Sequence, residues 1–176
     1  MKLRVWGFGV VLALALIGCE AVTTFVPLPL RQQPPTPQSE IPPHIAKMET
    51  AIWEQINTIR QENQLKPLRH NQLLAHIARE YSQKMARDNF FSHTSPDGTT
   101  PAQRVRDGGV FYLVVGENLF RSTNISDPVP SAVEGWMDSP GHRQNILHAV
   151  FSETGIGVWR EGNRYYITQL FLRSLL

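Results

Sequence analysis

The fold of this chain is decided by the stretch Trp136-Met137-Asp138-Ser139-Pro140-Gly141-His142-Arg143-Gln144-Asn145-Ile146-Leu147. Residues 129–137 have a helical composition and follow Asp127-Pro128, a pair that opens helices. Ser139-Pro140 then interrupts the helix, because proline lacks the backbone N–H that a helix interior requires. The stretch therefore predicts a helix over 129–137 and a further turn that carries His142 to Leu147.

Two segments upstream show the apolar spacing of amphipathic helices. The first begins near His44 and ends before Pro67, and its apolar positions are Ile45, Met48, Ile52, Ile56 and Ile59. The second follows Asn71, a residue suited to a helix N-cap, and its apolar positions are Leu74, Ile77, Ala78, Tyr81 and Met85. We expect the two helices to share a core.

The remaining segments predict loops, a short helix and strands. A polar loop over 89–100 leads to Thr100-Pro101, which start a short helix that stops at Gly108-Gly109. Residues 110–115 predict a strand that runs into Gly116-Glu117-Asn118, and two last strands, 155–160 and 164–172, flank the hairpin pair Gly162-Asn163. This order predicts an α+β domain with helices packed on a small antiparallel sheet.

Five motifs follow one another along the chain. They are Phe91-Ser92-His93-Thr94-Ser95-Pro96-Asp97-Gly98, Gly116-Glu117-Asn118-Leu119, the 136–147 stretch, Gly155-Ile156-Gly157-Val158 and Thr168-Gln169-Leu170-Phe171. In this order they resemble the bacterial branch of the CAP superfamily, which holds the cysteine-rich secretory proteins, antigen 5 and the pathogenesis-related proteins and whose domain is also called SCP-like. The resemblance covers residues 44–176. It implies an α-β-α sandwich at an extracytoplasmic location.

The resemblance also implies a cleft that gathers two histidines and two glutamates in many relatives. Matched by motif, three of these residues are His93, Glu117 and His142, while Ser139 stands where eukaryotic relatives have the second glutamate. Two imidazoles, a carboxylate and a water would complete the tetrahedral shell of a catalytic Zn²⁺. A divalent metal is therefore the candidate cofactor, and the departure at Ser139 puts a four-residue metal site in doubt.

A second interpretation of these residues needs no metal. His93, Glu117 and His142 can hydrogen-bond one another or the backbone and so lock the loops around a groove. Four further residues of the motifs are assigned supporting roles: loop-fixing contacts for Asn118 and Asn145, an ion pair with a carboxylate for Arg143, and a core position for Trp136.

Three classes of function remain open. The leading hypothesis is a binding module whose groove accepts an apolar or amphipathic ligand, because superfamily relatives bind lipids or sterols. A metal-dependent or serine hydrolase is the alternative, with Ser139 or Ser92 as nucleophile, His142 or His93 as base and Glu117 to orient it. The chain lacks the Gly-x-Ser-x-Gly motif that would favour this hydrolase. The third hypothesis is a protein-interaction module of the cell surface.

The N-terminus predicts export and lipid anchoring. Lys2 and Arg4 precede about a dozen apolar residues, which are too few for the ~20 that span a bilayer but suit a signal peptide. Leu16-Ile17-Gly18-Cys19 resembles the lipobox of bacterial lipoproteins. We therefore divide the chain into a signal peptide at 1–18, a lipidated Cys19 with a Pro-rich tether at 19–43, and a CAP domain at 44–176. The expected location is extracytoplasmic, at the outer membrane in a Gram-negative cell, because Glu20 is not the Asp of inner-membrane retention.

The charge balance argues against nucleic acid as a partner. The chain carries 17 Lys and Arg against 15 Asp and Glu, and Lys2 and Arg4 belong to the predicted signal peptide. Without these two residues the charges balance, and no run of basic residues offers the footprint that phosphate backbones require. The predicted partner is the membrane, reached through Cys19.

Overall fold

A computed structural model describes residues 41–175 of the chain. The predicted signal peptide, Cys19 and most of the predicted tether lie outside the described residues. The described elements are α1 (Pro43–Glu62), β1 (Arg69–His70), α2 (Gln72–Arg87), α3 (Pro101–Asp107), β2 (Tyr112–Thr123), α4 (Val129–Asp138), α5 (Pro140–Ile146), β3 (Glu153–Glu161) and β4 (Arg164–Ser174). Among these residues no helix combines the length and the apolar character needed to cross a membrane.

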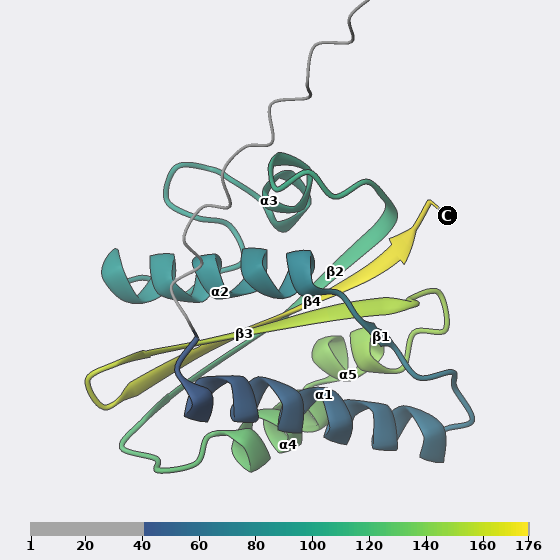
Figure 1. Ribbon diagram of the computed structural model, residues 1–176, viewed down its shortest axis with the longest axis horizontal. Coiled ribbons are helices and arrows are strands. Elements are labelled where there is room, and N and C mark those ends of the chain that lie inside the picture. The colour runs from purple at the N-terminus through teal and green to yellow at the C-terminus, as the bar shows by residue number, and fades with distance from the viewer. Residues whose placement is uncertain (1–40, 176) are drawn as a thin grey trace, which may run out of the picture. The chain divides into compact units, whose positions relative to one another are not determined.

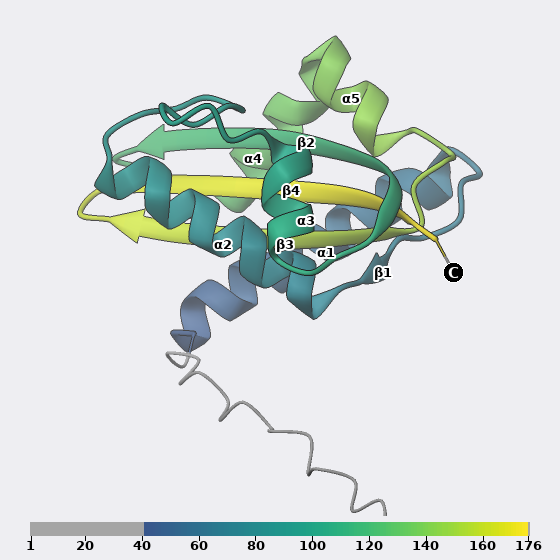
Figure 2. The same ribbon diagram turned by 90° about the horizontal axis from the view of Figure 1, so that it is seen from above.

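The elements form three layers with the sheet in the middle (Figure 1). Helices α2 and α3 cover one face of the sheet, and α1, α4 and α5 cover the other, as the view from above also shows (Figure 2). The expected α-β-α sandwich is therefore confirmed.

The sheet has the strand order β1-β3-β4-β2. Its three long strands are antiparallel, as expected, and β3 and β4 meet in the predicted hairpin, where Gly162 has a φ of +60°. The two-residue strand β1 pairs with β3 in parallel and makes the sheet mixed. A strand of two residues has no periodicity to detect, so the sequence could not predict it.

Strand β2 differs from its prediction in length. The strand expected over 110–115 runs from Tyr112 to Thr123 and pairs with β4 along its whole length, so Gly116-Glu117-Asn118 lies inside the strand. Successive side chains of a strand point to opposite faces. Glu117 therefore faces α3, and Asn118 faces α5, as their contacts confirm.

Each face of the sheet has its own core. Ile167 and Phe171 of β4 pack with α1, α4 and α5, whereas Leu170 and Leu172 pack with α2 and α3. The alternation follows from the two-residue period of a strand. Burial of such side chains is the main stabilising term of the fold, at ~25 cal/mol per Å² of apolar surface.

An ion pair contacts the outer edge of β3 beyond the short β1. Glu49 of α1 accepts from Arg79 of α2 through both carboxylate oxygens, at 2.9 and 2.8 Å, and also from the backbone N–H of Val158 at 3.0 Å. An open strand edge invites pairing with another chain. This pair occupies one backbone N–H of the edge and links the helices of the two outer layers.

Candidate functional site

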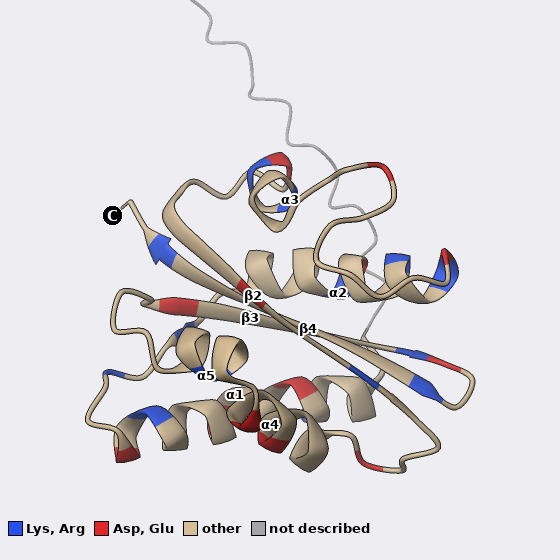
Figure 3. Cartoon of the chain, turned by 180° about the vertical axis from the view of Figure 1, so that it is seen from behind, with Lys and Arg blue, Asp and Glu red and all other residues tan. Residues whose placement is uncertain are grey.

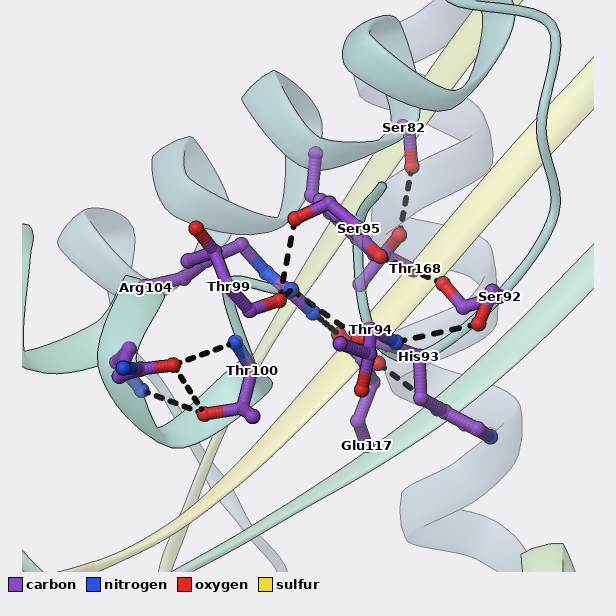
Figure 4. A network of polar contacts seen from close by, with 12 residues as sticks. Ser82, Ser92, His93, Thr94, Ser95, Thr99, Thr100, Arg104, Glu117 and Thr168 are labelled. Atoms are coloured by element: carbon purple, nitrogen blue, oxygen red, sulfur yellow. Dashed lines mark hydrogen bonds and ion pairs between the residues drawn. The ribbon is translucent and has the colours of Figure 1, made fainter. Parts of the chain in front are cut away.

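A buried carboxylate lies at the centre of the candidate site. Glu117, on β2, has a side chain that is 2% exposed, and each of its oxygens has a partner. Oε1 lies 2.8 Å from Nδ1 of His93, and Oε2 lies 2.6 Å from Nη2 of Arg104 (Figure 4). The strand, the loop before α3 and α3 itself thus meet at one carboxylate.

Arg104 is the member of the site that sequence reasoning missed. Its guanidinium carbon lies 3.2 Å from the ring centroid of Tyr81, and Nη1 donates to the carbonyls of His93 and Thr99 at 3.1 Å each. The signal was present, because Thr100 caps α3 with a full capping box and Arg104 lies one turn after it. The sequence did not show that Glu117 is the partner of Arg104, because Glu117 lies on another element.

The loop before α3 is held by its own polar contacts. Asp97 accepts from Thr99 N at 3.0 Å and from Ser95 Oγ at 2.8 Å, and Lys84 lies 3.3 Å from its other oxygen. Hydrogen bonds from Thr99, then from Ser95, keep the pKa of Asp97 well below its usual range. Beneath the loop, Tyr81 donates to the carbonyl of Ser92, and burial raises the pKa of Tyr81 to about 12. These contacts hold His93 in place.

The contacts of Glu117 determine which nitrogen of His93 faces outward. A carboxylate that is paired with a guanidinium only accepts hydrogen bonds, so Nδ1 of His93 must be the donor. Neutral His93 then carries a free lone pair on Nε2, and its side chain is 52% exposed. In this neutral form, the site offers a fixed acceptor at its surface.

His142 lies beside His93 but does not contact Glu117. The two rings are 6.4 Å apart between centroids. Asn118 donates to the His142 carbonyl at 3.2 Å, and Asn145 donates to Asn118 Oδ1 at 2.9 Å and to the Glu117 carbonyl at 3.2 Å. The loop-fixing roles expected for both asparagines agree with these contacts.

The helix that carries His142 is held by a buried arginine. Arg60 of α1 is 1% exposed and donates through Nη1 to the carbonyls of Ile146 and His148, at 2.6 and 3.2 Å. Carbonyls at a helix end lack partners within the helix. Arg60 supplies them for α5, although its place in an amphipathic helix pattern gave no sign of this role.

Two supporting residues have different outcomes. Trp136 is 1% exposed and donates through Nε1 to the Leu119 carbonyl at 2.9 Å, so it lies in the core as expected. The ion pair expected for Arg143 is wrong: its Nε donates to the carbonyl of Met137. The Met137 carbonyl lies in the last turn of α4, where carbonyls lack donors within the helix. Arg143 supplies that donor, and no carboxylate is its partner among the described residues.

The serines expected of a hydrolase have no histidine partner in the described structure. Ser139 begins α5 without a side-chain capping bond, and Ser92 Oγ accepts from Thr94 N at 3.3 Å. A serine nucleophile needs its base within hydrogen-bond reach. The described residues therefore show no serine–histidine pair for a serine hydrolase, and Ser139 and Ser92 as nucleophiles stay predictions.

The three-ligand metal site does not fit the geometry. Over residues 41–175 no group of three His, Cys, Asp or Glu side chains is placed to hold an ion. Both oxygens of Glu117 are engaged, and a cation bound there would lie beside the guanidinium of Arg104. Glu117 therefore acts on His93 through a hydrogen bond, and only two imidazoles are left as candidate ligands.

The proximity of the two histidines leads to a testable pH dependence. Burial lowers the pKa of His142 from the ordinary 6.5, and repulsion from His93 lowers it further. The unfolded chain thus takes up this proton first as the pH falls. The stability that neutral His142 contributes is complete above about pH 6.5 and is lost as the pH falls through the lowered pKa.

An NMR titration of wild type and of His93→Gln tests the cause of this shift. In His93→Gln we expect the pKa of His142 to rise but to stay below 6.5. A wild-type pKa of His142 at or above 6.5 would contradict this account.

A surface hollow of about 360 Å³ adjoins the site. Its lining combines an apolar wall, formed by Pro101, Ala102 and Val115, with a polar end. The polar residues are His93, Thr100 and Glu117. The hollow therefore has the two-sided character that suits an amphipathic molecule.

A three-layer sandwich with a glutamate on its edge strand and a histidine on each of two neighbouring segments is the arrangement that an SCP-like domain implies. The model of the cysteine-rich secretory protein family, CAP, matches residues 53–171, and the chain belongs to this family.

Similar proteins include extracellular and surface proteins of bacteria. The chain is 34% identical to YkwD of Bacillus subtilis, an uncharacterized protein, over 131 residues. This match covers 74% of this chain and 49% of that relative. A crystal structure of an extracellular SCP-domain protein from Bacillus anthracis has a TM-score of 0.67 at 32% identity, over 76% of this chain and 44% of that one. An outer surface protein of Borrelia burgdorferi has a TM-score of 0.66 at 22% identity, over 73% and 93%, which shows the fold alone. The chain thus spans about half the length of the first relative.

Proposed function

We propose that this CAP-domain protein is an extracytoplasmic binding module whose hollow beside His93 takes an amphipathic ligand. The observation that carries the proposal is the division of the hollow into the apolar wall of Pro101, Ala102 and Val115 and the polar end at His93 and Glu117. An alkyl chain would lie against the wall. The polar group of the ligand would meet Nε2 of His93, the acceptor that Glu117 orients outward.

The chemistry of that acceptor narrows the ligand. A lone pair on Nε2 accepts a hydrogen bond, so the ligand needs a donor such as a hydroxyl group. A carboxylate would bind only if His93 were protonated, because both groups would otherwise be acceptors. With His93 neutral, the proposal therefore favours long-chain alcohols or other hydroxylated lipids.

Filling the hollow tests the proposal. We expect dodecanol to bind the domain of residues 41–176, measured by native mass spectrometry, and Ala102→Trp to weaken binding at least ~10-fold, since ~1.4 kcal/mol of lost contact is enough for that factor. Ala149→Trp places the same ring at an exposed site outside the hollow and is the control. Equal binding by wild type and Ala102→Trp, or no adduct with wild type, would refute the hollow as the ligand site.

A metal held by His93 and His142 is the second candidate. The observation that favours it is the hydrogen bond from His93 to Glu117, because metal-binding histidines are commonly oriented by a carboxylate on the other ring nitrogen. A fold relative of 13% identity, NaASP2, was crystallised with Zn²⁺. With zinc in native mass spectrometry, this candidate requires an adduct that disappears in both His93→Ala and His142→Ala; an adduct that survives either change rules it out.

The lipid anchor at Cys19 is the remaining part of the proposal. Its support is the lipobox-like sequence before Cys19 and the extracellular and surface locations of similar proteins. In a bacterial host fed an alkyne-tagged fatty acid, we expect label on the full chain and none on Cys19→Ser. Label on both proteins, or on neither, would show that Cys19 is not the anchor.

A further inference from the structure

Apolar side chains gather in the open at one end of the sheet. Phe111 is 77% exposed and Leu113 is 60% exposed, and both lie where the chain enters β2. Val114 and Leu175 are exposed as well. We refer to these four residues, Phe111, Leu113, Val114 and Leu175, as the apolar end.

The strand pairing brings the four residues together. Tyr112 of β2 is opposite Ser174 of β4, so the residues that follow outward, Phe111 and Leu175, leave the sheet side by side. A register shift between Tyr112 and Val114 leaves Leu113 without a counterpart on β4. Such a bulge bends a strand and redirects its side chains, and it explains why neighbouring residues are exposed together.

The apolar end and the hollow are neighbours along β2. The next two residues along β2, Val115 and Gly116, line the hollow beside His93 and Glu117. Strand β2 thus leads from the apolar end to the wall of the candidate ligand site. Exposed apolar patches commonly mark binding surfaces, and the apolar end is such a patch.

Charged residues beside the apolar end indicate the kind of surface that it fits. Arg106 lies in the last turn of α3, just before the segment that carries Phe111, and Arg173 is opposite Val114 on β4. Figure 3 shows basic residues on α3 and at the end of β4, with Asp107 as the acidic neighbour on α3. Exposed aromatic and aliphatic groups flanked by arginines are the composition of proteins that lie on anionic membranes.

We propose that the apolar end docks on an anionic phospholipid surface, so that the hollow opens next to the lipid from which it takes its ligand. The opening of the hollow next to the lipid rests on the proposed function, whereas the docking of the domain itself does not.

Vesicle flotation tests the docking surface. The domain of residues 41–176 contains both cores, so we expect it to fold without the preceding segment. We expect it to float with vesicles of phosphatidylcholine and phosphatidylglycerol and to float less with phosphatidylcholine alone. Phe111→Ser and Leu113→Ser are each expected to reduce the partition coefficient ~5- to 10-fold, because each removes a side chain that enters the interface.

Two controls separate docking from general effects. Ile125→Ser removes an exposed aliphatic residue just beyond the other end of β2 and should leave flotation unchanged. Arg106→Gln with Arg173→Gln should weaken binding to the anionic vesicles alone. All substitutions lie on exposed positions, and unchanged urea midpoints would confirm that the fold is intact.

Several results would overturn the proposal. Wild-type protein that stays with the soluble fraction, or an Ile125→Ser loss as large as that of Leu113→Ser, excludes the apolar end as a membrane surface. Concentration-dependent dimers abolished by Phe111→Ser, without flotation, would assign the surface to a second copy of the chain. Ala102→Trp should float like wild type, because Ala102 lies outside the apolar end. Failure of dodecanol binding would thus count against the hollow, and failure of flotation would count against the docking surface.

Discussion

Replacement of Arg104 by methionine is expected to lower the free energy of unfolding by ~3–5 kcal/mol, the usual cost of breaking a buried ion pair from one side. The side chain of Arg104 is 10% exposed and that of Glu117 is 2% exposed, so the change leaves a carboxylate buried with His93 as its remaining partner. It also removes the guanidinium from the ring of Tyr81 and from the two loop carbonyls that it holds. Urea unfolding followed by circular dichroism measures the loss.

The double variant Arg104→Met, Glu117→Gln separates the charge from the packing. It should recover part of the loss, because a neutral amide is cheaper to bury than an unpaired carboxylate. Arg106→Met is the control, since Arg106 is an exposed arginine on the same helix, and it should change the stability by less than ~0.5 kcal/mol. If Arg104→Met were no more destabilising than Arg106→Met, Arg104 would not organise the site.

Replacement of Gly157 by alanine is the second large effect, with an expected loss of ~3 kcal/mol or more from overpacking. A Cβ atom at Gly157 would lie 2.0 Å from Arg79 N and 2.3 Å from Ala78 C, both in the backbone of α2. Backbone atoms of a helix cannot turn aside as a side chain can, so α2 would have to move off the sheet. Thermal and urea unfolding would both register the loss.

Gly135→Ala is the matched control for this prediction. At Gly135, within α4, an added Cβ would lie 3.8 Å from the nearest atom of Phe120, an ordinary contact distance. Alanine is favoured over glycine inside a helix by ~1 kcal/mol, so this variant should be as stable as wild type or more so. A loss at Gly135 equal to that at Gly157 would show that the close approach of α2 to β3 is not the cause.

The two predictions bear on function through the same helix. Helix α2 carries Tyr81, which lies under Arg104 and holds the Ser92 carbonyl, so the close packing on β3 places the floor of the site. A displaced α2 would alter the position of His93 as well as the stability. Loss of dodecanol binding in Gly157→Ala beside an intact Gly135→Ala would connect the packing with the proposed ligand site.

The sequence by itself determined the features that depend on neighbouring residues. Asn71 caps α2 by accepting from Leu74 N, Thr100 and Pro101 start α3, and Gly162 turns the hairpin, all at the predicted places. Capping, turn formation and helical periodicity operate over a few residues, so a single sequence contains the information that they require. The order of the five motifs indicated the family in the same way, because the motifs and their spacing are contained in the sequence.

Only the tertiary structure decided which of the distant residues meet. Strand β2 is longer than predicted because pairing with β4 extends it, and the two-residue β1 exists because β3 lies beside it. Arg104 replaces the expected metal as the partner of Glu117, and Arg143 turns to a carbonyl of α4. These contacts join residues that are 6 to 84 positions apart in the chain. No local preference encodes them, since each depends on distances that arise when the layers pack together.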